Sequence, residues 1–175
     1  MKSGLIIGLG NILNGDEGFG CCVLEALSNE SLGTSVQLSY LGDDPRSAGG
    51  LIYGADLMIV VGTLKLGEPA GRLYAWSYPV FRQHIACMAN EYQRIRLLIE
   101  ALSRAELAGS LPKDFLFLWI EPRLTEGFGM SVQARKALWK TTRAIKQKLF
   151  ENNLLPEIAL TVSRIYRLEP IVAEP

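Results

Sequence analysis

The sequence predicts an α/β protein, a three-layer α/β/α sandwich around a mostly parallel β-sheet. Continuous apolar runs at residues 57–61 and 115–120 are typical of parallel strands whose two faces are both covered. Segments with apolar residues at three- and four-residue spacing, typical of amphipathic helices, alternate with these runs. The length of 175 residues suits one hydrophobic core, so we expect a single domain over residues 1–167 and a tail over residues 168–175.

The first part of the chain alternates between strand and helix patterns. Residues 5–8 form an apolar run that ends in glycine and leads through turn residues into a periodic segment at 17–27, which predicts a strand, a turn and a helix. Residues 36–41 alternate as a strand does, a short helix is expected over 46–53, and residues 57–61 are the third strand. Right-handed crossovers then bring the carboxyl ends of the strands to one edge, where we expect the functional surface.

The second part predicts an exposed strand, two helices and two further strands. Alternation over residues 72–77 indicates a partly exposed strand, and one amphipathic helix is expected from about 88 to 107. After the strand at 115–120, Ser131 is in the position of an N-cap for a helix that runs to about residue 150. A last alternating run at 158–166 is a candidate edge strand.

Composition disfavours several classes of partner and site. Lys plus Arg equals Asp plus Glu at 18 each, which argues against nucleic acid and acidic membranes as partners. The N-terminal apolar run of about five residues is too short for a signal peptide or a membrane span, so we expect a cytoplasmic protein. Cys21, Cys22 and Cys87 lack the spacing of a zinc site, and we interpret them as reduced thiols in the core.

The loop after the first strand, residues 8–20, carries the most unusual pattern. Its GxG start resembles a dinucleotide site, but Leu13 stands where the third glycine is needed, which disfavours nucleotide binding. Asp16 and Glu17 come at the mouth of the following helix. Acids there either interact with the helix dipole or carry chemistry at the end of a strand, and the spacing alone leaves both open.

The segment GLGNILNGDEGFGCCVLEAL closely resembles the opening segment of the hydrogenase maturation endopeptidases, G-[IVL]-G-N-x-L-x-x-D-[DE]-G-x-G. Segments similar to later parts of that family follow in the same order at residues 42–45, 57–62, 67–71 and 119–131. The resemblance covers residues 4–150. It implies a phosphorylase/hydrolase-like α/β fold.

The resemblance also implies a function and a ligand set. These enzymes recognise nickel already inserted in the large subunit of a nickel-iron hydrogenase and then remove a C-terminal extension from that precursor. The nickel would belong to the substrate. The implied metal contacts are a Glu in the first loop, which is Glu17, an Asp at the third strand end, and a His at the start of the central helix. The Asp position falls on Val61 and the His position on Asn90 or Glu91, while the only histidine, His84, lies about two helical turns earlier.

Three readings follow from these departures. In the first, a metal site is rebuilt from Glu17, either His84 or Glu91, and one of Asp43 and Asp44. Such a carboxylate-rich set would be less selective for nickel than one containing imidazole. The protein would then process a hydrogenase large-subunit precursor.

In the second reading, the chain docks on that precursor or on another assembly partner without cutting it, and binds no metal itself. An apolar Val61 at a ligand position favours this.

In the third, the chain is an unrelated small-molecule enzyme or binding protein on the same fold. In the first reading Glu17 and Asp16 are the catalytic candidates, with Asp16 orienting the loop, and we expect the Glu17 carboxylate to share a crevice with two other strand ends.

Overall fold

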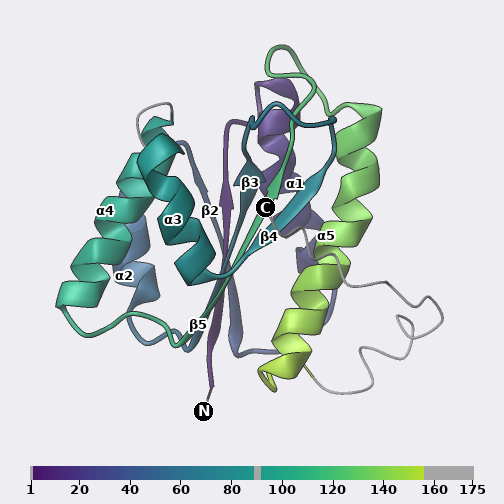
Figure 1. The fold of residues 1–175 in the computed structure, drawn as a ribbon. Coiled ribbons are helices and arrows are strands. Elements are labelled where there is room, and N and C mark those ends of the chain that lie inside the picture. The colour runs from purple at the N-terminus through teal and green to yellow at the C-terminus, as the bar shows by residue number, and fades with distance from the viewer. Residues whose placement is uncertain (1, 89–91, 156–175) are drawn as a thin grey trace.

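The computed structural model describes residues 2–88 and 92–155 and confirms the predicted three-layer fold (Figure 1). A five-stranded sheet lies between two layers of helices. In chain order the elements are β1 (Gly4–Leu9), η1 (Gly15–Gly18), α1 (Phe19–Ser28), β2 (Val36–Gly42), η2 (Pro45–Ser47), α2 (Ala48–Ile52), β3 (Leu57–Thr63), β4 (Leu73–Trp76), α3 (Tyr78–Met88), α4 (Gln93–Leu107), β5 (Asp114–Ile120) and α5 (Val132–Glu151).

The sheet has the order β2-β1-β3-β5-β4 and is parallel except for β4. Its central strands are in tight register, with Gly8 beside Val61 and Val61 beside Leu118. β4 pairs antiparallel with β5 at one edge, which confirms the strand predicted over residues 72–77. The partial exposure predicted for it was wrong for most of β4, because Leu73, Tyr74 and Trp76 are buried. The carboxyl ends of β1, β3 and β5 therefore meet at the same edge, at the top of Figure 1.

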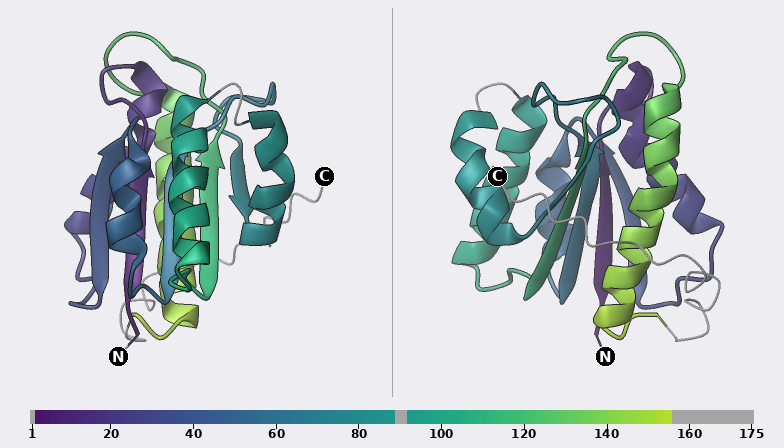
Figure 2. Two further views of the ribbon diagram at one scale, coloured as in Figure 1. Left: turned by 90° about the vertical axis from the view of Figure 1, so that its left-hand side faces the viewer. Right: turned by 45° about the vertical axis from the view of Figure 1, so that its right-hand side comes forward.

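Each face of the sheet has its own helices and its own apolar cluster. Helices α2, α3 and α4 cover one face, and α1 and α5 cover the other (Figure 2). Side chains alternate between faces along a strand, so Met58 and Val60 of β3 pack under α4 while Ile59 and Val61 pack under α1 and α5. This division decides which strand residues can face a group carried by α4.

The helix predicted from about 88 to 107 corresponds to α4, which begins only at Gln93, so the predicted start was wrong. A separate helix that was not predicted, α3, begins at Tyr78. Pro79 is compatible with the first turn of a helix, because a backbone N–H at this position would have no partner within the helix. Phe81, two residues later, is fully buried and stacks on Phe117 at 4.0 Å between ring centroids.

One further prediction, the N-cap at Ser131, falls inside the described residues, and the predictions for the C-terminal end fall outside them. The N-cap assigned to Ser131 is confirmed, since its hydroxyl accepts a hydrogen bond from the N–H of Ala134 at 3.1 Å. The candidate strand at 158–166 and the tail at 168–175 lie outside the described residues, and the domain limit at residue 167 stays a prediction. Among the residues described, no helix is both long and apolar enough to cross a membrane.

Candidate functional site

Two glycines fold the acidic turn onto the end of β1. Gly10 has a φ of +107°, and a Cβ there would come within 2.1 Å of the carbonyl oxygen of Glu17. A Cβ on Gly20 would lie 2.5 Å from the carbonyl oxygen of Leu9, so α1 can pack closely on the strand. The glycines therefore allow close backbone packing, and the 3-10 turn η1 presents Asp16 and Glu17 at the carboxyl edge of the sheet.

Asp16 is fully buried and ties the acidic turn to the loop between β5 and α5. Its Oδ2 accepts hydrogen bonds from the N–H of Arg123 at 2.8 Å and of Leu124 at 3.0 Å. Its Oδ1 accepts from the N–H of Ser131 at 2.6 Å, and the Ser131 hydroxyl donates to Oδ2 at 2.8 Å. The N–H of Gly15 also donates to the carbonyl of Gly127 at 2.6 Å.

These donors keep Asp16 ionised. Burial would raise the pKa of Asp16, but the hydrogen bonds from the N–H groups of Leu124, Ser131 and Arg123 and from the Ser131 hydroxyl outweigh it, so the pKa lies below its ordinary value of 3.8. Because both oxygens of Asp16 accept these hydrogen bonds, the carboxylate holds the acidic turn and the loop between β5 and α5 together. The supporting role expected for Asp16 agrees with this geometry.

Glu17 points the other way and pairs with Arg94, the second residue of α4. Nη1 of Arg94 donates to Oε2 of Glu17 at 3.0 Å, and Nη2 donates to Oε1 at 3.3 Å, so the pair is bidentate. The side chains are mostly buried, with 8% of Arg94 and 18% of Glu17 exposed. The acid that the resemblance marks as a metal contact is therefore paired with a guanidinium.

Two further residues complete what we call the Arg94 cluster, which consists of Glu17, Asp43, Thr63 and Arg94. Nη2 of Arg94 donates to the carbonyl oxygen and to the hydroxyl of Thr63, both at 3.1 Å. Nη1 lies 3.4 Å from Oδ1 of Asp43, whose side chain is half exposed at 51%. The cluster joins η1, the end of β3, the loop after β2 and the start of α4, because Arg94 contacts Glu17 and also residues at the ends of two other strands.

The guanidinium of Arg94 also contacts an aromatic ring. The ring of Tyr92 lies 5.4 Å from its guanidinium carbon, within range of a cation–π contact. The Tyr92 hydroxyl accepts a hydrogen bond from the N–H of Lys65 at 3.1 Å, which fixes the ring. Nε of Arg94 is buried and has no hydrogen-bond partner among the described residues.

On β3, the side chain at position 61 faces away from the cluster. Val61 is fully buried in the apolar layer under α1 and α5. The next residue, Gly62, is on the same face as Arg94 by strand alternation, and a Cβ there would be 3.0 Å from the ring of Trp119. The Trp119 ring thus fills the space that a side chain at position 62 would need.

The other metal candidates do not gather around Glu17 among the described residues. His84 lies on α3, where Nδ1 is 2.9 Å from the carbonyl oxygen of Val80 and the ring stacks on Trp76 at 4.8 Å. Asp44 pairs with the exposed Arg46 and accepts a hydrogen bond from its N–H at 3.2 Å.

Asn90 and Glu91 lie outside the described residues. Among the described side chains, those of residues 2–84 and 92–155, no group of three or more His, Cys, Asp or Glu is arranged to hold a metal ion.

Sequence reasoning missed Arg94 and Glu121. Glu121 directly follows β5, is only 3% exposed, and accepts hydrogen bonds from the N–H of Leu66 at 2.8 Å, the N–H of Gly67 at 3.0 Å and the Tyr74 hydroxyl at 3.0 Å. It fixes the loop after β3 much as Asp16 fixes the loop after β5. Burial, together with the hydrogen bond to Glu121, raises the pKa of Tyr74.

The cysteines do not form a reactive site in the described part of the chain. Cys21 and Cys22 are free and half-buried on α1, so the expectation that they lie in the core was wrong. Burial, with a smaller contribution from Glu25, raises the pKa of both thiols, which disfavours a thiolate. The side chain of Cys87 lies outside the described residues.

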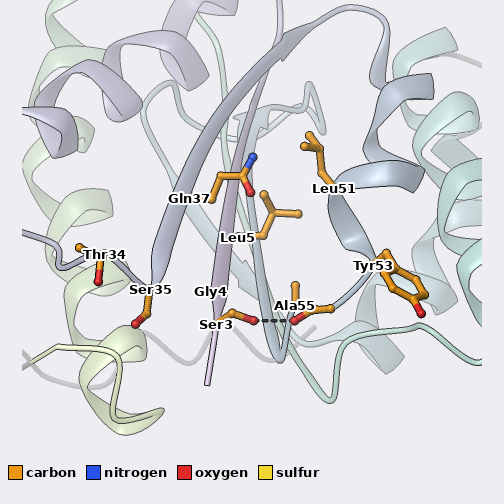
Figure 3. Close-up of a pocket in the computed structure, with 10 residues that line it drawn as sticks. Ser3, Gly4, Leu5, Thr34, Ser35, Gln37, Leu51, Tyr53 and Ala55 are labelled. Atoms are coloured by element: carbon orange, nitrogen blue, oxygen red, sulfur yellow. Dashed lines mark hydrogen bonds between the residues drawn. The ribbon is translucent and has the colours of Figure 1, made fainter. Parts of the chain in front are cut away.

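An open pocket of about 240 Å³ lies at the opposite, amino-terminal end of the sheet (Figure 3). Ser3, Leu5, Gln37 and Tyr53 are among its lining residues, and none of the residues that line it is charged. The Ser3 hydroxyl is already used, since it donates to the carbonyl of Gly54 at 2.6 Å. Tyr53 is the one titratable residue in the lining, and no carboxylate or imidazole lines the pocket with it.

Comparisons with known proteins agree with the site's family resemblance. No family model matches the chain. The chain is 26% identical over 130 residues to the hydrogenase expression/formation protein HupD of Thiocapsa roseopersicina, an alignment that covers 74% of this chain and 58% of that relative. The chain therefore spans less than two thirds of the length of this relative.

Solved structures share the fold. The hydrogenase maturating endopeptidase HybD from E. coli superposes with a TM-score of 0.79 at 21% identity, covering 86% of this chain and 93% of that one. The [NiFe] hydrogenase maturation protease HybD from Thermococcus kodakarensis gives a TM-score of 0.70 at 16% identity, covering 83% and 97%. At these identities the structures establish the α/β fold, and together with the sequence match they confirm the resemblance predicted from the motifs.

Proposed function

We propose that this chain is a hydrogenase-maturation-protease-like protein that acts on the C-terminal extension of a nickel-iron hydrogenase large-subunit precursor. The observation that carries the proposal is the acidic turn η1, which the motif GLGNILNGDEGFG forms on this fold at the carboxyl edge of the sheet. In it, Asp16 fixes the turn and the Glu17 carboxylate is presented beside two other strand ends. Similarity to HupD and to the HybD structures supports the same assignment.

The described residues do not fit a metal resident in this chain. Glu17 is paired with Arg94, and the β3 position on the same face is Gly62, packed against Trp119. Any nickel in the reaction would be that of the partner, as the resemblance implies. What this chain's own residues supply is a rigid acidic turn for docking and positioning, with Glu17 as the candidate catalytic carboxylate and Asp16 as its support.

Exposed apolar residues beside the acidic turn offer a surface for that partner. Ile12 and Leu13 are 51% and 55% exposed, and Phe128, in the loop between β5 and α5, is 87% exposed. The Asp16 hydrogen bonds hold these two loops together, so the apolar side chains are presented on a fixed backbone. Large exposed apolar groups on a rigid loop are typical of protein docking sites.

The proposal is tested by incubating the full chain with nickel-loaded and apo forms of a co-encoded large-subunit precursor and measuring the precursor mass. We expect the nickel-loaded precursor to lose its extension and the apo form to stay intact. Glu17→Gln should abolish the mass change. The matched control is Glu25→Gln, the same substitution at an exposed acid on α1, which should leave cleavage unchanged. If the chain neither binds nor cleaves either precursor, the proposal is contradicted.

Docking is tested separately with Phe128→Ser, which we expect to weaken precursor binding by about tenfold, as loss of a buried aromatic contact does. Its control is Leu107→Ser at the far end of α4, where the side chain is 89% exposed. Equal binding by the two variants would remove the loop from the docking surface.

A second candidate is a docking or assembly factor that binds the precursor without cutting it. The specific observation in its favour is the Arg94–Glu17 ion pair, which occupies both carboxylate oxygens of Glu17. Binding to the precursor without any change of its mass would favour this candidate over the protease. A cytoplasmic location belongs to the same proposal.

A further inference from the structure

The Arg94 guanidinium lies in a cage of oxygen atoms of the kind that usually holds a cation. Five oxygens contact its two terminal nitrogens: both carboxylate oxygens of Glu17, Oδ1 of Asp43, and the carbonyl and hydroxyl oxygens of Thr63. Carboxylate, carbonyl and hydroxyl oxygens are also the donors that hard divalent cations prefer. We infer that Arg94 is the resident cation of this cage and that it excludes divalent metals from Glu17 in the free chain.

Space is the first reason. A transition metal needs oxygen ligands at about 2.0 to 2.2 Å. Nη1 lies 3.0 Å from Oε2 of Glu17 and 3.4 Å from Oδ1 of Asp43, so it occupies the space beside both oxygens that a metal shared by them would need. A metal could enter only if Arg94 moved out.

Charge is the second reason. The two carboxylates and one guanidinium of the cluster leave a single excess negative charge. A divalent ion placed beside a retained guanidinium would meet strong repulsion in a partly buried site.

Anchoring is the third reason. Arg94 is 7% exposed and is held by Thr63 on β3 and by the ring of Tyr92, so withdrawal would break several contacts at once. Lys would not replace it well, since an ammonium is a point charge and cannot bridge Glu17 and Thr63 with a planar fork. On β3, Gly62 has no side chain that could add a ligand to the oxygens of Thr63.

The inference concerns the free chain and is independent of whether a precursor is cut. Nickel chloride is titrated calorimetrically into the full wild-type chain and into Glu17→Gln. We expect the two titrations to coincide, because any background sites, such as His84 or the cysteines, are common to both. A nickel site in the wild type that Glu17→Gln weakens tenfold or more would overturn the inference.

The complementary variant removes the resident cation. Arg94→Gln should bind nickel at least about tenfold more tightly than the wild-type chain does, and the added change Glu17→Gln should abolish this gain. Circular dichroism establishes which variants are folded. If Arg94→Gln does not fold, the comparison of wild type with Glu17→Gln still decides the matter. A folded Arg94→Gln that gains no nickel binding dependent on Glu17 would also overturn the inference, because exclusion by Arg94 would then explain nothing.

Discussion

Asp16 and Glu17 are neighbours in the chain, yet their carboxylates serve two different regions of the molecule. Asp16 faces the loop before α5 and is bound by backbone N–H groups and by the Ser131 hydroxyl. Glu17 faces α4 and is bound by the side chain of Arg94. Most donors to Asp16 are backbone N–H groups, which a substitution does not remove, whereas the donor to Glu17 is a side chain, which a substitution can remove. Substitutions of neighbouring residues can therefore change the partner of Glu17 more readily than the partners of Asp16.

Loss of the Asp16 charge should have the largest effect on stability. Asp16→Asn keeps the shape of the side chain but turns an amide NH₂ toward buried N–H donors, so we expect the free energy of unfolding to fall by about 3 kcal/mol. Urea denaturation measures the change. The matched control Glu25→Gln, at an exposed acid, should stay within about 0.5 kcal/mol of the wild type. Equal losses in both variants would contradict the comparison.

Removal of the guanidinium should cost less, because part of the Glu17 region is open to water. Arg94→Gln leaves a mostly buried carboxylate without its cation, and we expect a loss of about 2 kcal/mol in the free energy of unfolding. Arg104→Gln, at an exposed position of the same helix, controls for removing an arginine from α4. A change near zero in Arg94→Gln would mean that the ion pair contributes nothing to the fold.

Acid should weaken the Asp16 region selectively. Because the pKa of Asp16 lies below 3.8 in the folded chain, its contribution is fully present above that value and is lost as the pH falls through the folded pKa. The denaturation midpoints of wild type and Asp16→Asn, measured at pH 7, 5 and 3, should therefore lie closer together at pH 3 than at pH 7. A difference that stays constant over this range would refute the ionised state of Asp16.

The smallest effect is expected at the exposed rim of the Arg94 cluster. Asp43 is half exposed and lies 3.4 Å from Nη1, so Asp43→Asn should change the free energy of unfolding by less than about 0.5 kcal/mol. Thermal unfolding at low and high salt measures it. A larger loss that disappears at high salt would show that Asp43 contributes more to holding Arg94 than its exposure indicates.

The sequence predicted the elements whose patterns are local. The apolar runs that became β3 and β5 and the N-cap at Ser131 were predicted close to their observed positions. α3 was missed because Pro79 and the surrounding aromatic residues looked like a strand end, and only packing against Phe117 shows the helix to be favourable. The half-burial of Cys21 likewise depends on tertiary context.

The centre of the site was harder to predict, because it depends on residues far apart in the chain. Glu17 and Arg94 are 77 positions apart, and their pairing depends on how α4 packs against the sheet. A signal was nevertheless present: Arg94 precedes Leu98 by four residues and Ala101 by seven, on the apolar face of α4. Arginine is rarely buried without a partner, so its place on that face indicated a buried acid nearby.

The most direct measurement is a double-mutant cycle on Glu17 and Arg94, with unfolding free energies of wild type, Glu17→Gln, Arg94→Gln and the double variant. We predict a coupling energy of about 2 kcal/mol, because each substitution removes the same interaction. Additivity within about 0.5 kcal/mol would mean that the two side chains do not depend on one another. The view of Arg94 as the cation that satisfies Glu17 would then be wrong.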